Sequence, residues 1–414
     1  MGASGSPLSI MIVAGEASGD KHGASLVRAL QTSYPNHKFD FFGSGGGEMR
    51  AAGVETLVDA RDVGVIGVLE ALGALGRLIR AYRALVAAAL TRKPAAVILI
   101  DWPDFNLRLA RRLSREYLPI VYYISPQIWA WRSHRVKAVK KYVQRMLVIL
   151  PFEEEFYRKA GIESEFVGHP LAGMVAADAL REEFARRHGL DPARPIIALL
   201  PGSRPGEVRH HLPVMLDAAR LLAASPANRE RSSPGRSSGP KFGDVQFVIP
   251  VAPTIPLELI DGLTQSMELP FKAIEKDTYN ALAHSKMAVV ASGTATVEAA
   301  LLGVPMVIIY RGSELSYRLL RPLIKLDTFG MVNLIAGKRI VPELIQHDAT
   351  GGKIADAVAT MLADEKLLAV TRAELRQVRE RLMEGGSDAS ERAARAVMKV
   401  AVESKQSPKR PGAD

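Results

Sequence analysis

Short, continuously apolar runs that alternate with amphipathic helical stretches constrain the fold of this chain more than any other feature of its sequence. The runs are LSIMIVAG, KFDFFGSG, AAVILIDW, PIVYYIS, RMLVILPF, RPIIALLPGS, VQFVIPVA, MAVVASGT and VPMVIIYR. Hydrophobicity that continues through a strand, rather than alternating, is typical of strands buried on both faces of a parallel sheet. The alternation of β and α segments therefore predicts doubly wound α/β domains.

The chain has 414 residues, a length that accommodates two such domains. The strand pattern pauses at FVGHPLAGMVAADALREEFARRHGLDPARP before a second series opens at Ile196. We predict an N-terminal domain over 7–171, a C-terminal domain over 172–384, and a terminal helix with a disordered basic tail over 385–414. Residues 225–244, rich in Ser, Pro, Gly and Arg, are predicted to form a mobile insertion in the second domain.

Composition excludes several classes of function. The chain has no cysteine, so disulfides, thiolate metal sites and cysteine nucleophiles are ruled out. A G-x-x-x-x-G-K-[ST] loop, a complete dinucleotide fingerprint, a D-x-D pair and a metal-binding histidine cluster are all missing, so we expect neither a metal nor a cofactor. No apolar run approaches the ~20 residues of a transmembrane helix. The net charge of +10 suits nucleic acid, an anionic membrane or a phosphorylated substrate.

Ligands of parallel α/β domains bind at the carboxyl ends of the strands, so the loops that follow strands are candidate sites. The loop GEASGDKHG after the first strand precedes a helix expected to begin near Lys21. Its Ser18 or Asp20 could cap that helix, or contact a ligand, and the sequence supports both interpretations equally. The candidate residues of this cleft loop are Glu16, Ser18, Gly19 and Asp20.

Two further strand-to-helix junctions, LLPGSRPGEV and ASGTATVEAALLGVP, lie in the second half of the chain. Helix N-termini carry free amides and a partial positive charge, so two of them at one crevice would suit a diphosphate. An arginine beside them would add a charge-assisted hydrogen bond. The residues predicted for this anion site are Gly202, Ser203, Arg204, Ser292, Gly293, Thr294 and Glu298.

The stretch VILIDWPDFNLRLARRL places two acids around a proline. Asp101 ends a buried-type strand on the crevice side and is our candidate general base, because burial can raise its pKa. Asp104, just after Pro103, stands where a helix N-cap belongs, so we expect it to satisfy the amides of Asn106 or Leu107.

One apolar stripe predicts either a helix on a membrane surface or an ordinary helix facing the core, and the pattern leaves both open. Its members are Leu69, Leu72, Leu75, Leu78, Ile79 and Tyr82, and they are interspersed with or followed by Arg77, Arg80 and Arg83. The segment SPQIWAWRSHRVKAVKKYVQR combines tryptophans with basic residues. It fits a solvated helix or an anionic membrane as well as nucleic acid, and no nucleic-acid-binding signature accompanies it. We expect no nucleic-acid partner.

The ordered motifs AGEASGD, IDWPDFNLRLA, SPQIWAWR, LPFEEEFY, FVGHPLA, LLPGSRPGEV and ASGTATVEAALLGVPM, from about Ile10 to Glu343, resemble those of the lipid-A-disaccharide synthases. The resemblance implies a GT-B-type fold, in which two Rossmann-like doubly wound domains face each other across a cleft. It implies an inverting, metal-independent glycosyltransferase that joins UDP-2,3-diacylglucosamine to 2,3-diacylglucosamine 1-phosphate, giving UDP and a β-1,6-linked lipid A disaccharide 1-phosphate. It also implies a cytoplasmic enzyme at the anionic inner membrane of a Gram-negative-type bacterium, and leaves open a homodimer.

Within this resemblance Asp101 matches the base and Arg204 the diphosphate-binding arginine, while Glu298 matches the residue that meets the ribose and Asn333 a UDP-site residue. The chain departs from the family pattern at Trp102, where a small residue is usual, and at Val332, where proline is common. A UDP-N-acetylglucosamine 2-epimerase-like enzyme and a non-catalytic lipid-binding protein are the alternative functions.

Overall fold

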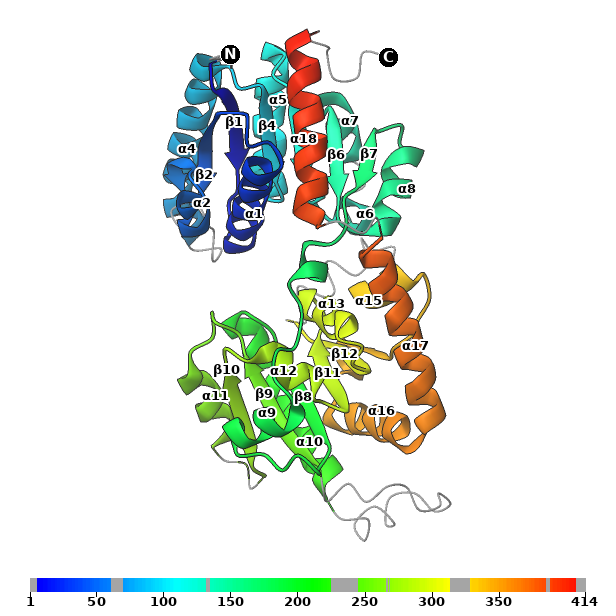
Figure 1. Ribbon diagram of the computed structural model, residues 1–414. Helices are drawn as coiled ribbons and strands as arrows, with labels where there is room; N and C mark the ends of the chain where they lie inside the picture. Colours follow the sequence, from blue (N-terminus) through cyan, green and yellow to red (C-terminus); the bar gives the residue numbers. More distant parts are fainter. Residues whose placement is uncertain are drawn as a thin grey trace. The chain divides into compact units, whose positions relative to one another are not determined.

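The computed structural model describes residues 6–60, 70–131, 135–224, 245–265, 267, 269–312, 328–384 and 388–406, without the side chains of 70–74, 130, 131 and 404–406. Leu69, the side chain of Leu72, the 225–244 insertion and the last residues of the basic tail lie outside this description. The chain divides into two compact units, Met1–Pro170 with Leu382–Asp414, and Leu171–Arg381 (Figure 1).

The first unit is built on a parallel sheet of seven strands in the order β3-β2-β1-β4-β5-β6-β7. The strands are β1 (Leu8–Val13), β2 (Phe39–Gly45), β3 (Glu55–Asp59), β4 (Ala96–Ile100), β5 (Ile120–Tyr123), β6 (Arg145–Val148) and β7 (Ser164–Phe166). Side chains of β1 alternate between two cores: Ile10 and Ile12 enter one, Met11 and Val13 the other. This double burial explains why the strand sequences are continuously apolar.

Helices cover both faces of this sheet. Residues of α1, α2 and α18 join the core on one face, and residues of α4, α5, α7 and α8 the core on the other. The helices of the first unit are α1 (Ala17–Ser33), α2 (Gly47–Ala51), α4 (Glu70–Arg92), α5 (Pro103–Leu113), α6 (Ile128–Trp131), α7 (Val136–Tyr142), α8 (Pro151–Lys159) and α18 (Ala389–Gln406), with a 3-10 turn at η1 (Ser114–Glu116).

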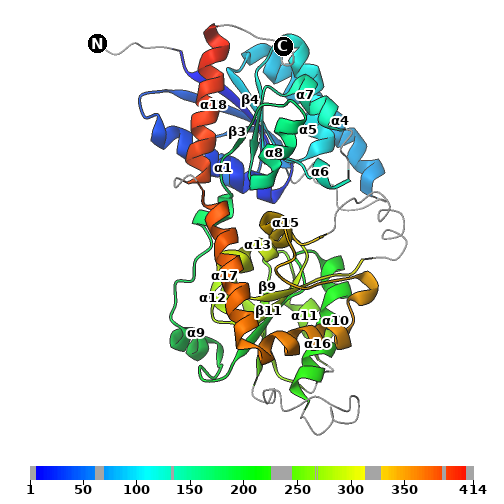
Figure 2. The same ribbon diagram turned by 90° about the vertical axis from the view of Figure 1, so that its right-hand side faces the viewer.

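The terminal helix α18 belongs to the first unit although it lies at the far end of the chain. It packs beside α1 in both views (Figures 1 and 2), and Val397 and Ala401 are buried in the same core as Ile10. The sequence pattern had assigned this segment to neither domain. The amphipathic pattern predicts that one face of this helix packs against a hydrophobic surface, but it does not show which of the two sheets provides that surface.

The second unit holds a parallel sheet of six strands in the order β10-β9-β8-β11-β12-β13. Its strands are β8 (Ile196–Leu200), β9 (Gln246–Val251), β10 (Phe271–Glu275), β11 (Met287–Ala291), β12 (Met306–Tyr310) and β13 (Glu343–Ile345). Its helices are α9 (Arg181–His188), α10 (Pro205–Ala223), α11 (Leu257–Thr264), α12 (Thr278–Ala283), α13 (Thr294–Leu301), α15 (Met331–Ala336), α16 (Gly351–Ala363) and α17 (Glu365–Leu382), with 3-10 turns at η3 (Pro170–Gly173) and η7 (Gln346–Asp348).

Both sheets reverse their strand order at one point, between β1 and β4 in the first unit and between β8 and β11 in the second. At such a switch point the connections from the two strands run to opposite sides, which leaves a crevice at their carboxyl ends. Each unit of the chain therefore has one position where its topology favours ligand binding. Within the part of the chain that the structure describes, no helix is both long and apolar enough to span a bilayer.

Candidate functional site

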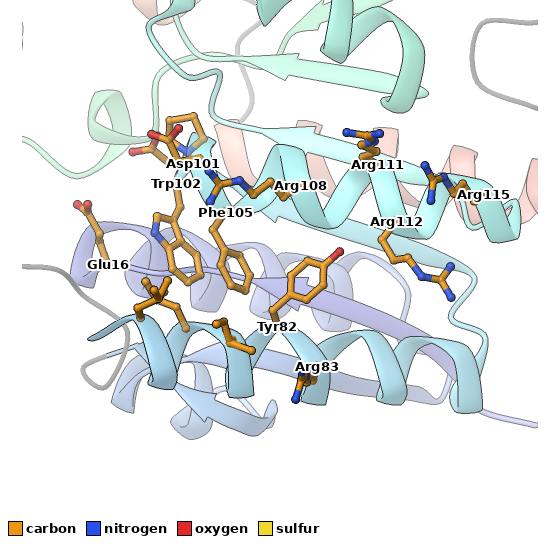
Figure 3. Close-up of a pocket in the computed structure, with 15 residues that line it drawn as sticks. Glu16, Tyr82, Arg83, Asp101, Trp102, Phe105, Arg108, Arg111, Arg112 and Arg115 are labelled. Carbon is orange, nitrogen blue, oxygen red and sulfur yellow. The ribbon is translucent and has the colours of Figure 1, made fainter. Parts of the chain in front are cut away.

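A cavity of about 910 Å³ lies in the first unit, beside the carboxyl end of β4. Its wall includes Glu16 from the loop after β1, Asp101 and Trp102 after β4, and side chains of the facing helices α4 and α5 (Figure 3). The two loops come from the strands at the switch point of the sheet. The cavity is therefore the place where this unit would hold a small ligand.

Asp101 sits in a strained turn at the mouth of this cavity. Asp101 and Trp102 both adopt the left-handed backbone conformation, with φ of 45° and 49°. Non-glycine residues hold this conformation only where their surroundings impose it. Two buried side chains do so, because Asn106 Nδ2 and Tyr122 Oη donate hydrogen bonds to the Asp101 carbonyl oxygen at 2.8 and 2.5 Å. The fold thus aims the Asp101 side chain rather than leaving it to a mobile loop.

Burial, together with a smaller contribution from the negative charge of Glu16, raises the pKa of the Asp101 carboxyl from 3.8 to about 6. A hydrogen bond from the Trp102 backbone opposes the shift. The carboxylate is therefore ionised at neutral pH yet more basic than an exposed aspartate. This is the property that a general base near pH 7 requires.

Three aromatic rings form one wall beside Asp101. The Trp102 indole stacks on Phe105 with 3.9 Å between ring centroids and 6° between planes, and Tyr82 meets Phe105 edge-on at 6.0 Å. The indole also lies flat against Gly15, where a Cβ atom would come within 2.2 Å of it. Glycine at this position leaves the space that the Trp102 ring occupies, so the ring shapes the cavity wall without blocking Asp101.

The apolar side of the cavity comes from α4. Leu75, Leu78 and Ile79 line it, and Leu75 and Ile79 keep 55% and 43% of their surface exposed. The core of the first unit includes Leu85 and Ala89 of the same helix, and the partly buried Leu78 packs against it. Leu75 and Ile79 thus leave an exposed apolar surface at the cavity, and the lipid-facing interpretation of the stripe stays a prediction.

The predicted cap at Asp104 is wrong, and so is the cap interpretation of Asp20. Helix α5 begins at Pro103 with Trp102 as its N-cap, so Asp104 is inside the first turn, where its carboxylate pairs with Arg135. Helix α1 begins at Ala17, four residues before the predicted start, which places Asp20 within the helix.

The buried Asp20 carboxylate instead holds the start of α2. It accepts hydrogen bonds from the backbone N–H groups of Gly46, Glu48 and Met49 at 2.6, 3.0 and 3.0 Å. Among the cleft-loop candidates, Glu16 lines the cavity and Ser18 is exposed, whereas Gly19 is buried against Ala14. Asp20 and Gly19 are thus buried and have structural roles, whereas Glu16 is the cleft-loop residue that lines the cavity.

Basic side chains that were not predicted from the sequence form another side of the cavity. Arg108, Arg111, Arg112 and Arg115 lie along α5 and the turn that follows it, and Arg83 lies on α4. The signal was present in LRLARRLSRE, where arginines recur at helical spacing. An exposed basic helix face is common, and only the fold shows that this one borders a cavity.

The residues predicted for the anion site lie at the switch point of the second sheet. The strands β8 and β11 pair in parallel, so the loops that follow them adjoin. Gly202 adopts a φ of 120° between β8 and α10, and a Cβ atom there would approach Glu207 Oε2 within 2.6 Å. Gly293 is the N-cap of α13 and has no side chain to bond the first amides of that helix, which begin at Thr294. Backbone amides of α13 thus remain for an external acceptor.

Arg204 stands at the N-cap of α10 with 76% of its side chain exposed. Its Nη1 donates to Glu207 Oε1 at 3.1 Å, and Ser203 N–H donates to Glu207 Oε2 at the same distance. Glu207 therefore occupies part of the α10 N-terminus in this structure. Ser292 Oγ donates to the Phe329 carbonyl at 3.3 Å. Glu298 lies beside Tyr279, whose pKa is raised by partial burial and by the Glu298 charge.

The side chain of Asn333 is bonded entirely within the protein. Its side chain is fully buried, and its Nδ2 donates to the Val341 carbonyl and to Glu343 Oε1 while its Oδ1 accepts from Ile340 N–H and Val341 N–H. The neighbouring Val332 is buried as well. The side chain of Asn333, predicted to contact UDP, thus stabilises the loop before β13 instead.

The adjacent histidines of α10, His210 and His211, have different environments. His210 is exposed, but His211 is buried, and its two ring nitrogens bridge the Pro201 carbonyl at 2.8 Å and the Arg311 N–H at 3.0 Å. Burial lowers the pKa of His211, so the neutral ring donates from Nδ1 and accepts at Nε2. This ring ties the loop after β8 to the end of β12.

Comparison with known proteins assigns the family. The family model described as lipid-A-disaccharide synthetase matches residues 10–398. The lipid-A-disaccharide synthase of Koribacter versatilis (strain Ellin345) is 44% identical over 397 residues, which cover 95% of this chain and 99% of that protein. The enzyme of the same name from Geobacter sulfurreducens is 43% identical over 391 residues, which cover 94% and 97%. The chain belongs to the lipid-A-disaccharide synthase family. As a member of this family it is a glycosyltransferase of lipid A biosynthesis.

Solved structures place the family member among GT-B folds. The S. aureus MnaA structure with UDP superposes with a TM-score of 0.61 at 14% identity, covering 95% of this chain and 97% of that chain. The glycosyltransferase of kitacinnamycin gives 0.60 at 15% identity, covering 95% and 99%. These likenesses concern the fold alone, and the predicted pair of Rossmann-like parallel-sheet domains is confirmed.

Proposed function

We propose that this member of the lipid-A-disaccharide synthase family transfers the sugar of UDP-2,3-diacylglucosamine to the 6-hydroxyl of 2,3-diacylglucosamine 1-phosphate. The products are UDP and the β-1,6-linked disaccharide 1-phosphate. The observation that carries the site assignment is the Asp101 carboxyl, whose pKa burial raises to about 6 at the wall of the cavity in the first unit.

Asp101 acts as the general base in this proposal. Its carboxylate accepts the proton of the acceptor 6-hydroxyl while that oxygen attacks the anomeric carbon of the donor. The bond between the anomeric carbon and the UDP oxygen breaks as the new bond forms on the opposite face, so the configuration inverts. The hydrogen bonds of Asn106 and Tyr122 to the Asp101 backbone hold the carboxylate in place during the proton transfer.

UDP occupies the switch point of the second sheet. The free amides of α13 meet the diphosphate, and Arg204 exchanges its ion pair with Glu207 for a phosphate oxygen. Departure of UDP concentrates negative charge on its terminal phosphate, and these preorganised donors stabilise that charge. Glu298 accepts a hydrogen bond from the ribose, which its place in α13 near the end of β11 allows.

The acyl chains of the acceptor lie along α4. The exposed Leu75 and Ile79 offer an apolar surface at the cavity, and Arg83 on the same helix adds positive charge that suits anionic headgroups. We therefore propose that the enzyme works bound peripherally to the cytoplasmic face of an anionic membrane, where both of its amphiphilic substrates reside.

The test is an assay with both sugars, in which mass spectrometry identifies the product and UDP release gives the rate. We expect a disaccharide 1-phosphate and acceptor-dependent UDP release. A 2-epimerase would alter the donor without an acceptor, so donor isomerisation with no disaccharide contradicts the proposal. Asp101→Asn should lower turnover by about 10² or more. Asp104→Asn is the comparison variant, because it removes a second carboxylate that also lines the cavity but is 60% exposed and pairs with Arg135, an interaction of a class worth about 0 to 1 kcal/mol.

A further inference from the structure

The basic side of the cavity carries more positive charge than its surroundings balance. Arg112 pairs with Glu116 at 2.6 Å, but Arg108, Arg111 and Arg115 form no ion pair with any residue that the structure describes. Like charges at this helical spacing repel one another. A cluster of this kind beside an apolar wall is stabilised by a bound anion, so the cavity suits an amphiphile with an anionic group.

Among these arginines, Arg108 lies nearest to Asp101 along the helix. It lies five residues after Pro103, which is about 7 to 8 Å along the helix axis. Side chains of a helix lean toward its N-terminus, so the guanidinium of Arg108 extends back toward Asp101. Figure 3 shows Arg108 on the Asp101 side of α5, and Arg111, Arg112 and Arg115 farther along. Those three lie one to two helical turns beyond it, about 5 to 11 Å farther from the base.

We propose that Arg108 binds the 1-phosphate of the acceptor sugar and thereby places the acceptor 6-hydroxyl at Asp101. The inference rests on the proposed function, because the 1-phosphate and the 6-hydroxyl belong to the same pyranose ring. An arginine can bind the 1-phosphate while Asp101 accepts the proton of the 6-hydroxyl only if the arginine and Asp101 are no farther apart than the width of one sugar ring. The guanidinium fork matches two phosphate oxygens, which fixes orientation as well as position. Arg111 and Arg115 strengthen the positive field that draws the phosphate into the cavity.

The apolar neighbours of Arg108 support a lipid-linked phosphate. Phe105 lies one turn before it on α5, and Leu78 and Ile79 face the same cavity from α4. A soluble sugar phosphate would gain nothing from these side chains, whereas the acyl chains of the acceptor bury them. The cavity therefore combines an apolar wall, a phosphate-binding arginine and a general base.

The experiment compares two acceptors, 2,3-diacylglucosamine 1-phosphate and the same molecule without its phosphate, in neutral detergent micelles that hold no anionic lipid. We measure kcat/KM for both acceptors with the wild-type enzyme, Arg108→Gln, Arg108→Lys and Arg28→Gln. Arg28 is an exposed arginine of α1 in the same unit, outside the cavity, and serves as the matched control. Thermal unfolding of each variant shows that it is folded.

We expect the wild-type enzyme and Arg28→Gln to prefer the phosphorylated acceptor by about ten- to a hundred-fold, the range of a lost hydrogen bond to a charged group. Arg108→Gln should lower kcat/KM by that factor for the phosphorylated acceptor alone, so that the preference disappears. Arg108→Lys should restore part of it, because lysine keeps the charge without the fork. The KM for the UDP-sugar should not change in any variant.

Other outcomes overturn the inference. If a folded Arg108→Gln enzyme keeps the wild-type preference, Arg108 does not bind the acceptor phosphate. If the preference persists while the variant loses binding to phosphatidylglycerol vesicles but not to phosphatidylcholine vesicles, the arginine binds lipid headgroups instead. Failure of the proposed function looks different, since the wild-type enzyme would then form no disaccharide from either acceptor.

Discussion

Replacing Asp101 by asparagine should inactivate the enzyme and stabilise its first unit. Burial and Glu16 raise the pKa of this carboxyl from 3.8 to about 6, a shift of roughly two units, and each unit corresponds to 1.36 kcal/mol. The folded state therefore holds the proton more tightly than the unfolded state. Stability is fully present below pH 3.8, falls as the pH rises toward 6, and stays about 3 kcal/mol lower above it. Asparagine does not ionise and tolerates the left-handed backbone at this position.

At pH 8 we therefore expect Asp101→Asn to raise the free energy of unfolding by about 3 kcal/mol, and at pH 4.5 by only about 1 kcal/mol. Urea unfolding followed by tryptophan fluorescence measures this selectively, because Trp102, Trp129 and Trp131 all lie in the first unit. Asp104→Asn should show no such pH-dependent gain. An Asp101→Asn protein that is no more stable than the wild type at pH 8, or equally stabilised at both pH values, would refute the ionisation argument.

The remaining predictions concern rate, UDP affinity and membrane binding. A pH profile should show kcat/KM rising to a plateau above about 6 as Asp101 deprotonates. Glu16→Gln should move this rise to lower pH, because it removes the negative charge that makes the smaller contribution to the raised pKa of Asp101. Arg204→Ala should weaken UDP binding by about 1.5 to 3 kcal/mol, and unchanged calorimetric affinity would remove it from the site. Replacing Leu75 and Ile79 together by serine should reduce sedimentation with anionic vesicles without lowering the melting temperature, since both side chains are exposed; a lower melting temperature would mean that they belong to the core.

The two parallel sheets were predictable because burial on both faces leaves a direct mark in the sequence. Runs such as AVILI at β4 and IIALL at β8 are apolar at every position, and the structure buries every residue of both strands. The place of Asp101 followed from the same logic, since a strand of this kind ends at the crevice. The hydrophobic pattern and the topology rules together thus predict which residues lie at the carboxyl edge of the sheet, without knowledge of any tertiary contact.

Hydrogen-bond partners were not predictable in the same way. Asp104 and Asp20 both looked like caps of the helix that follows them, because an acid near a helix start usually bonds local amides. The structure pairs Asp104 with Arg135, 31 residues away, and Asp20 with the start of α2, 26 to 29 residues away. The family resemblance implied a UDP contact for Asn333, but its side-chain amide bonds the loop before β13.

By itself the sequence determined the strand pattern, the switch-point loops and the acid at the end of β4, because each depends on the order of neighbouring residues along the chain. The tertiary structure alone decided that Asp101 is buried beside Glu16, that Trp102 lies against Gly15, and that the arginines of α5 border the same cavity. A pKa, a cavity wall and a charge cluster depend on groups distant in sequence that folding brings within a few ångströms. Their energies arise only from that proximity, which no local pattern records.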